Sequence, residues 1–96
     1  MLVVVAYDVN TEKALGRRSL RRMARVCKDF GLRVQKSIFE CKVVGSQWVK
    51  LRHLLLKEMK EEEDSLRFYF IDESAQKKTE HHGLGKPIDL EGPLIA

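Results

Sequence analysis

The chain has 96 residues and a net charge of +4, with 44% hydrophobic and 33% charged residues. This length favours one domain around a single core, and the longest apolar run is far too short to cross a bilayer, so no membrane partner is expected. The start of the chain shows no signal-peptide pattern, which predicts a cytoplasmic protein, and the basic charge favours a polyanionic partner.

The first predicted element is a buried strand at about 2–9. Leu2 to Ala6 form a continuous apolar run, which is typical of a strand covered on both faces. The run ends on Tyr7 and Asp8, although aspartate is depleted in strands and costly to bury without a partner. Asp8 therefore either caps the following connector by accepting its backbone N–H groups, or holds something that arrives from solvent. The residues alone leave both roles open.

A connector at 10–16 leads into a predicted amphipathic helix at about 17–30. The apolar side chains of this helix recur at steps of three and four residues. They are Leu20, Met23, Ala24, Cys27 and Phe30. Gly31 is expected to end the helix as its C-terminal glycine.

The basic residues of this helix lie off its apolar face. They are Arg17, Arg18, Arg21, Arg22, Arg25 and Lys28. No acidic residue follows until Asp29, so their mutual repulsion is not relieved within the helix. Arginine suits phosphate because its fork donates two parallel hydrogen bonds. We therefore favour contact with a nucleic-acid backbone over the alternative of a solvated helix surface, and such contact carries little sequence information.

The stretch "LRVQKSIFECKVV" is rich in β-forming residues, but its alternation slips. Apolar residues fall on even positions up to Val34 and on odd positions from Phe39 onward. Because a one-residue slip moves side chains to the opposite face, we expect two short strands with a bulge or tight turn at about 35–37. Cys27 and Cys41 match no zinc-binding spacing and are too few for a disulfide framework, so we expect buried free thiols.

Gly45 and Ser46 open a second predicted helix, with Ser46 as its N-cap. The inner face of this helix is lined by Trp48, Leu51, Leu55 and Met59. The segment "SLRFYFI" at 65–71 then alternates as a strand. Residues 72–78 are predicted to form a polar loop, and residues 79–83 could form a short edge strand.

The predicted order is β-α-β-β-α-β with an extra C-terminal strand. This order indicates an α+β, ferredoxin-like fold, in which an antiparallel sheet carries two helices on one face. We divide the chain into a ferredoxin-like domain at 1–83 and a tail at 84–96. The apolar residues of the tail need burial, but Pro87 and Pro93 restrict a regular central strand.

Three segments taken together resemble the CRISPR-associated protein 2 family, the small partner of the CRISPR integrase: "VVVAYDV", "GLRVQKSIFEC" and "SLRFYFI". The tail "IDLEGPLI" resembles the version found with type I-C systems. The resemblance implies a ferredoxin-like homodimer in which the C-terminal segment adds to the sheet of the partner. It also implies a metal-dependent endonuclease that uses Mg²⁺ or Mn²⁺ on single-stranded RNA or double-stranded DNA. The same dimer would form the centre of the spacer-integration complex with the CRISPR integrase.

The resemblance also assigns roles to individual residues. Asp8 matches the metal ligand of the family, and with the preceding Tyr7 it forms the implied catalytic pair. Two copies of Asp8 near a two-fold axis could share one cation. Arg33, Ser37 and Phe39 match the family's pattern "R-x-Q-x-S-x-F". The resemblance implies that Arg33 contacts the nucleic acid and that Ser37 and Phe39 are supporting residues of the site. The family also carries basic residues on its first helix, and Arg18, Arg21 and Arg22 are the nearest candidates for these nucleic-acid contacts in this chain.

Other functions stay open at this point. A dimeric, non-catalytic scaffold that grips DNA and the integrase is favoured by the lone carboxylate, while the Tyr-Asp pair keeps a nuclease in view. A third alternative is a small toxin-like ribonuclease, or an RNA-binding domain, outside CRISPR systems. Glu80, His81 and His82 could bind a metal, but neighbours on a strand point to opposite faces, so we assign no site there.

Overall fold

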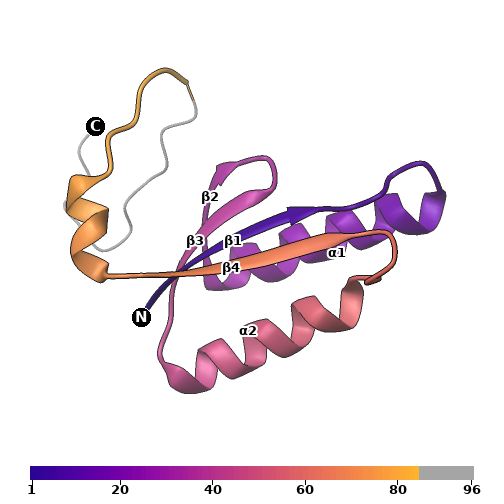
Figure 1. The fold of residues 1–96 in the computed structure, drawn as a ribbon, viewed down its shortest axis with the longest axis horizontal. Helices are drawn as coiled ribbons and strands as arrows, with labels where there is room; N and C mark the ends of the chain where they lie inside the picture. The colour runs from indigo at the N-terminus through magenta and orange to yellow at the C-terminus, as the bar shows by residue number, and fades with distance from the viewer. Residues whose placement is uncertain (85–96) are drawn as a thin grey trace.

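Figure 1 shows the computed structural model, which describes residues 1–84 of the chain. The elements follow one another as β1 (Leu2–Asp8), α1 (Ala14–Phe30), β2 (Gly31–Gln35), β3 (Ile38–Lys42), α2 (Gly45–Glu58), β4 (Ser65–Ile71) and the 3₁₀-helix η1 (Glu73–Lys78). The predicted order of strands and helices is confirmed. The additional strand predicted in the tail at 84–96 lies outside the described residues, except for its first residue, Leu84.

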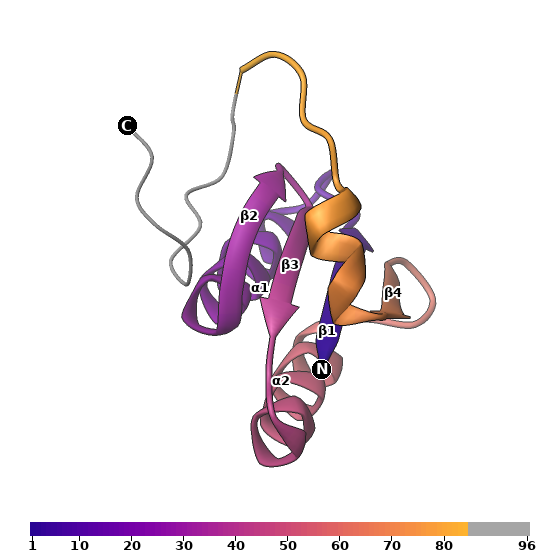
Figure 2. The ribbon, with the colours of Figure 1, turned by 90° about the vertical axis from the view of Figure 1, so that its left-hand side faces the viewer.

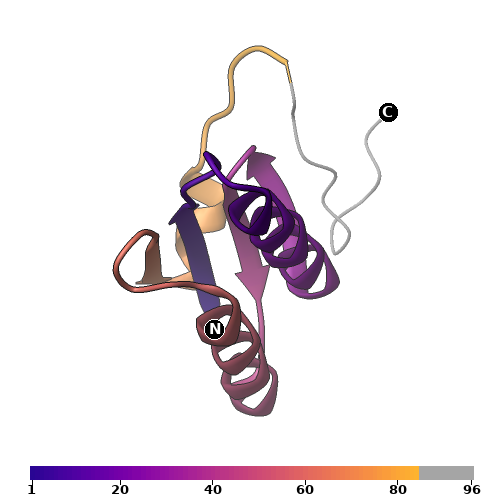
Figure 3. The same cartoon turned by 90° about the vertical axis from the view of Figure 1, so that its right-hand side faces the viewer.

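The four strands form one antiparallel sheet in the order β2-β3-β1-β4, and Figure 2 shows them side by side in this order. β1 and β2 are joined through α1, yet β3 lies between them. This split β-α-β arrangement confirms the predicted ferredoxin-like α+β fold. Figure 3 views the end of the molecule where β1 leads into α1 and where α2 leads into β4.

The core lies between the sheet and the two α-helices. α1 contributes Met23 and Cys27, α2 contributes Leu51 and Leu55, and every one of these side chains is fully buried. The facing side chains of the sheet include Val3, Val5, Tyr7, Phe39 and Cys41. Alternation along the strands therefore assigns Leu2, Val4, Ala6 and Asp8 to the opposite face of the sheet. None of the helices in residues 1–84 is long and apolar enough to cross a membrane.

A hydrogen bond between the two helices complements this packing. Ser19 of α1 is buried, and its hydroxyl donates to the backbone carbonyl of Glu58 at the end of α2 at 2.8 Å. A buried hydroxyl without a partner would be costly, so this bond fixes where the last turn of α2 lies against α1.

The predicted phase slip is a register shift between β2 and β3. Arg33 pairs with Phe39 and Gln35 pairs with Ile38, so Val34 is the extra residue on β2. A bulge of this kind moves the following side chains to the other face, which explains the change of alternation in the sequence.

Gly31 ends α1 as predicted, but for a different reason. Its φ of −166° is extended rather than left-handed, and it is already the first residue of β2. A Cβ atom at this position would lie 2.3 Å from the carbonyl oxygen of Glu40 and 2.7 Å from Sγ of Cys41. Glycine is required here because β2 approaches β3 too closely for any side chain.

The start of α2 and the end of β4 also differ from the prediction. α2 begins at Gly45, so Ser46 lies inside the first turn and is not the N-cap; the backbone N–H of Val44 donates instead to Oε1 of Gln47 at 2.8 Å. Residues 73–78 form η1 rather than a loop, because Oδ1 of Asp72 accepts the N–H of Ser74 at 3.0 Å and starts the turn. Residues 79–83 form no strand, so the predicted edge strand there is wrong.

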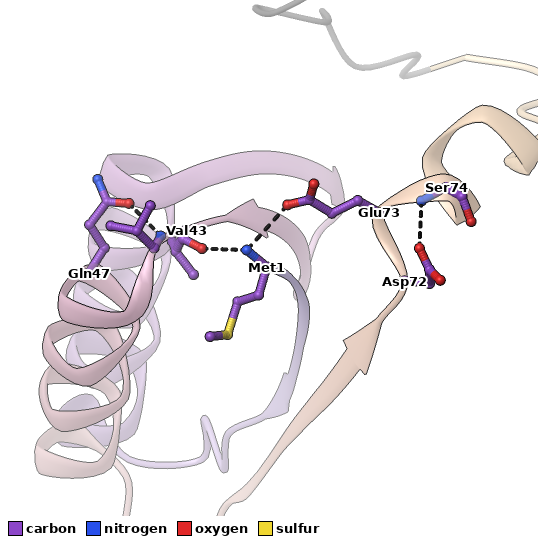
Figure 4. Close-up of polar contacts among 7 residues, drawn as sticks. Met1, Val43, Gln47, Asp72, Glu73 and Ser74 are labelled. Carbon is purple, nitrogen blue, oxygen red and sulfur yellow. Dashed lines mark hydrogen bonds and ion pairs between the residues drawn. The ribbon is translucent and has the colours of Figure 1, made fainter.

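Figure 4 shows how η1 is attached to the rest of the domain. The amino group of Met1 donates to the carbonyl oxygen of Val43 at 2.6 Å and forms an ion pair with the carboxylate of Glu73 at 3.2 Å. The backbone N–H of Val43 donates in return to the carbonyl oxygen of Met1 at 2.9 Å. The beginning of β1 therefore joins the end of β3 to the first residue of η1.

Candidate active site at the end of the first strand

Asp8 is the last residue of β1, opposite Ser65 at the start of β4. Its side chain is exposed, on the sheet face opposite the two helices. Within residues 1–84 its carboxylate forms no hydrogen bond and no ion pair, so it is available to a ligand from solvent.

The alternative role of Asp8, as the cap of the following connector, is filled by other residues. The backbone N–H of Asn10 donates to Oδ1 of Asp64 at 3.0 Å, and Oδ1 of Asn10 accepts the N–H of Glu12 at 3.0 Å. The second oxygen of Asp64 accepts the N–H of Lys60 at 2.9 Å. The connector is thus capped by Asn10 and Asp64, which leaves Asp8 without this structural task.

A hollow of about 420 Å³ surrounds the end of β1. Its wall comes from the end of β1, the turn between β2 and β3 with the residues that flank it, and the outward-facing residues of β4 from Ser65 to Tyr69. The side chains of its wall that carry polar groups belong to Tyr7, Asp8, Gln35, Lys36, Ser37, Ser65, Arg67 and Tyr69. The predicted residues Asp8 and Ser37 are therefore brought together, and two cations accompany them.

Two contacts hold parts of this wall in place. The backbone N–H of Tyr7 donates to the carbonyl oxygen of Ser37 at 3.1 Å, which ties the β2–β3 turn to the end of β1. The guanidinium of Arg67 donates to the hydroxyl of Tyr69 at 2.9 Å and lies 5.7 Å from the centre of its ring. Arg67 thus carries its charge on an outward-facing part of β4, at the rim of the hollow.

Tyr7 reaches the wall of the hollow, but its ring belongs to the core. Tyr7 is only 5% exposed, and its ring stacks on that of Phe39 with 6.2 Å between centroids. The hydroxyl is buried without a hydrogen-bond partner among the described residues. Burial raises the pKa of Tyr7, the nearby Cys27 thiol adds to the increase, and Arg33 opposes it. The structure does not bring this hydroxyl to the exposed face that carries Asp8.

Arg33 lies above the same aromatic pair. Its Nε donates to the carbonyl oxygen of Lys36 at 3.1 Å, and its guanidinium is 5.2 Å from the centre of the Phe39 ring. A guanidinium over an aromatic face is attracted by the ring. The pattern "R-x-Q-x-S-x-F" therefore has a local explanation: Arg33 and Phe39 stack across the β2–β3 pair, and Ser37 joins the turn to β1.

The predicted nucleic-acid residues separate into two groups. Arg21 and Arg33 line one hollow between α1 and β2, together with Arg25 and Lys28. Arg22 instead forms an ion pair with Glu58 of α2, with 3.8 Å between the charged atoms, and Arg18 is exposed farther along the helix.

The remaining candidates form no site within the described residues. Cys27 and Cys41 are buried free thiols, as predicted. His82 forms an exposed pair with Glu80 at 2.6 Å, and no group of three metal-ligating side chains occurs in residues 1–84.

Sequence reasoning missed Lys36, Ser65, Arg67 and Tyr69 as wall residues. The alternation of "SLRFYFI" already places Arg67 and Tyr69 on the outward face of β4. Their position beside Asp8 depends on the register between β1 and β4, in which Ala6 pairs with Arg67, and the sequence pattern does not reveal that register.

Comparisons with known proteins agree with the fold. A model of the CRISPR associated protein Cas2 family matches residues 1–79. The chain is 58% identical over 95 residues to the CRISPR-associated endoribonuclease Cas2 of Chlorobaculum tepidum, with 99% of each chain covered. It is 44% identical over 95 residues to the CRISPR-associated endonuclease Cas2 of Halalkalibacterium halodurans, again with 99% of each chain covered. The crystal structure of Streptococcus pyogenes Cas2 is similar with a TM-score of 0.78 and 44% identity, covering 86% of this chain and 100% of that one.

Proposed function

The chain belongs to the CRISPR-associated protein Cas2 family, and on that premise we propose that it is a metal-dependent endonuclease that hydrolyses phosphodiester bonds at Asp8. The observation that carries the proposal is the exposed carboxylate of Asp8, which has no partner within residues 1–84. It extends from a strand that is hydrogen-bonded on both sides, to β3 and to β4. A charged group held on a rigid element and left unpaired is suited to binding a ligand.

Mg²⁺ or Mn²⁺ is the proposed metal. Mg²⁺ keeps several waters and is commonly held by one or two carboxylates together with substrate phosphate. This fits the wall of the hollow, to which the described residues contribute one acid, Asp8. Asp8 would hold the ion, and a second carboxylate would come from another copy of the chain. A bound ion would offset the charge of the phosphate and lower the pKa of a coordinated water.

The second copy is proposed to pack on the sheet face that carries Asp8. Val4, Ala6 and Asp8 share this face, and Tyr69 and Ile71 extend it with 44% and 36% of their surfaces exposed. Exposed apolar sheet faces favour association, and two sheets can pack face to face. A two-fold axis near the end of β1 would bring two copies of Asp8 together. The tail at 84–96, proposed to add to the sheet of the partner, lies outside the described residues.

The other residues of the hollow have proposed supporting roles. Lys36 and Arg67 would offset the negative charge of the phosphate, and Ser37 would hold the turn against β1. Tyr7 would act as a positioning residue, because its ring stacks on Phe39 beneath the strand end while its hydroxyl is buried. Among residues 1–84, Asp8 is the only acid in this wall and no histidine lines it, so proton transfer is weakly assisted and cleavage should be slow.

Asp8→Asn tests the nuclease directly, because asparagine keeps the shape of the side chain and removes its charge. We expect the variant to lose metal-dependent cleavage of RNA and DNA substrates while it keeps its fold and oligomeric state. Cleavage would be followed on labelled oligonucleotides with Mg²⁺ or Mn²⁺ and with a chelator. A purified Asp8→Asn protein that cuts at the wild-type rate would contradict the assignment.

A second proposed function is that of a scaffold at the centre of the spacer-integration complex, gripping DNA and the CRISPR integrase. The single carboxylate among the described wall residues of the Asp8 hollow and the basic surface of α1 favour it. A spacer-acquisition assay with the integrase separates the two functions. Full acquisition by a cleavage-deficient Asp8→Asn variant would make the scaffold the main role, and lost acquisition would make hydrolysis essential.

The remaining alternatives are narrowed by the family. Membership in the Cas2 family argues against a toxin-like ribonuclease outside CRISPR systems. The relatives include proteins named endoribonuclease and proteins named endonuclease, so both RNA and DNA belong in the cleavage assay. The assignment to type I-C systems, based on the tail, stays a prediction.

A further inference from the structure

The α-amino group of Met1 joins segments that are distant in the chain, as Figure 4 shows. It donates to the carbonyl oxygen of Val43 at 2.6 Å, and it forms an ion pair with the carboxylate of Glu73 at 3.2 Å. The backbone N–H of Val43 donates back to the carbonyl oxygen of Met1 at 2.9 Å. Met1 and Val43 thus exchange both backbone bonds of an antiparallel pair, one step beyond the pair of Leu2 and Lys42.

The ion pair connects η1 to the start of the sheet. The described side chains of η1 are all exposed, and none of them belongs to the hydrophobic core: Glu73, Ser74, Lys77 and Lys78. Among these four, Glu73 alone forms an ion pair, and Ser74 is bonded to the adjacent Asp72. The contact between Glu73 and Met1 is therefore the one through which the described side chains hold η1 against the sheet.

Acylation of this amine would affect its two contacts unequally. An ammonium offers three N–H donors and a positive charge, whereas an acylated amine is a neutral amide with one N–H. That N–H can still serve the carbonyl oxygen of Val43, because Met1 stays paired with Val43 through its own carbonyl oxygen. Glu73 loses both its donor and its counter-charge, and the added acyl oxygen is an acceptor that a carboxylate does not bind. The contact with η1 is the one that is lost.

We infer that the α-amino group of Met1 is a modification site that decides whether η1 is docked. The free ammonium holds η1 through Glu73, and an acyl group on Met1, formyl or acetyl, releases it. Met1 is 46% exposed, so its amine is within reach of a modifying enzyme. Because η1 follows β4 directly, its docking sets the direction in which the chain leaves the sheet.

This role places one class of reaction before docking in a chain that carries a formyl group on Met1. Hydrolysis breaks the C–N bond of the formamide. The oxygen of one water goes to the formyl carbon, which leaves as formate, and the nitrogen takes up both protons of that water to become the ammonium. Water is the sole co-reactant, so an amide hydrolysis at Met1 supplies the form in which η1 is docked.

Chains that differ only at this amine test the inference. A synthetic segment 1–26 with a free, formylated or acetylated Met1 would be ligated at Cys27 to residues 27–96, and circular dichroism would compare each product with the expressed protein. NMR would then measure the solvent exchange of the backbone amides of residues 73–78. The series would be repeated with Glu73→Gln. The matched control is Glu61→Gln, which removes an exposed acid from the turn after α2.

Either acyl group should speed exchange at residues 73–78 about two- to five-fold, the factor that an exposed ion pair supplies. Glu73→Gln should cause the same increase with a free amine, and acylation of that variant should add nothing. The increase should shrink at high salt, which screens the ion pair. Exchange of the Val43 N–H should not change, since its acceptor on Met1 is kept.

Equal exchange in the free and acylated chains would overturn the inference. So would an acyl effect that persists in full in Glu73→Gln, because the acyl group would then act through another contact. The expressed Glu73→Gln protein gives a test that needs no ligation: exchange at residues 73–78 that matches the Glu61→Gln control would also overturn it.

Discussion

At the scale of single residues, Tyr7 and Asp8 show how one step along a strand separates two roles. Tyr7 lies in the core against Phe39, whereas Asp8 is exposed on the other face of the sheet. The family pattern places the two side by side as a catalytic pair. The period of two in a strand already assigns adjacent residues to opposite faces, so their separation was available from the sequence. The capping of the connector by Asn10 and Asp64 could not be predicted from the sequence, because Asp64 is distant in the chain.

The buried thiols predict a loss of stability in alkaline solution. Burial raises the pKa of Cys27 to about 12, with a contribution from Cys41, and that of Cys41 to about 11, with a contribution from Glu40. Between the ordinary thiol value of 9.0 and these raised values, the unfolded chain loses protons that the folded chain keeps. The free energy of unfolding should therefore be unaffected by the thiols below pH 9 and fall above it, by up to about 1.4 kcal/mol per pH unit for each thiol.

Urea unfolding from pH 7 to 11 under reducing conditions would measure this dependence. Cys27→Ala is the comparison, since it removes one thiol while every other group that titrates in this range is kept. The variant should show a shallower decrease above pH 9 than the wild type. Parallel decreases in the two proteins would mean that Cys27 does not retain its proton in the folded state.

At the scale of elements, the β2–β3 pair determines the shape of the site. Arg33 pairs directly with Phe39 just before the register shift and lies over its ring, and the turn supplies Lys36 and Ser37 to the Asp8 hollow. The change of alternation in the sequence was sufficient to predict the slip. The same change of alternation could not predict which residues lie next to the β2–β3 turn, because the position of the turn depends on its hydrogen bond to β1.

Gly31→Ala should destabilise the domain, because its Cβ would overlap the backbone of Glu40. We expect a loss of about 1–3 kcal/mol in the free energy of unfolding, as for other overpacked positions. Gly45→Ala is the control: nothing lies within 4 Å of its Cβ, so alanine in the first turn of α2 should be neutral or stabilising by up to about 1 kcal/mol. Chemical denaturation of both variants checks this, and equal stabilities would show that β2 and β3 tolerate a wider spacing.

Sequence patterns predict some elements of this fold and not others. Hydrophobic periodicity predicts β1, both helices and β4 because each buries one face or a continuous run. Contacts between distant segments decide the rest: Gly31 is required by Cys41, and η1 is joined to Met1 through Glu73. Local sequence does not contain those neighbours. The predicted cap at Ser46 was wrong for a local reason, because Gln47, three residues after Val44, accepts the N–H of Val44, and the strand predicted at 79–83 was wrong as well.

At the scale of the whole molecule, the two faces of the sheet have different tasks. One face packs on the helices, and the other carries Asp8 beside an apolar surface proposed to bind a second copy. Tyr69→Lys should weaken this dimer, because it places a charge on the proposed interface, whereas Val49→Lys on α2, where Val49 is 66% exposed, should leave the dimer intact. Light scattering over a concentration series would distinguish the two. A dimer equally stable in both variants would place the interface elsewhere.

The central claim is that Asp8 holds a divalent cation at the end of β1. Titration of Mn²⁺ followed by electron paramagnetic resonance tests it most directly, because it requires no knowledge of the natural substrate. Two adjoining carboxylates repel unless a cation or a proton lies between them, so the wild type should bind Mn²⁺ weakly, at one ion per dimer. A non-cleavable oligonucleotide should tighten that binding by supplying phosphate ligands. The account predicts that Asp8→Asn loses this ion with and without the oligonucleotide, and an Asp8→Asn protein that binds Mn²⁺ with wild-type affinity and stoichiometry would contradict it.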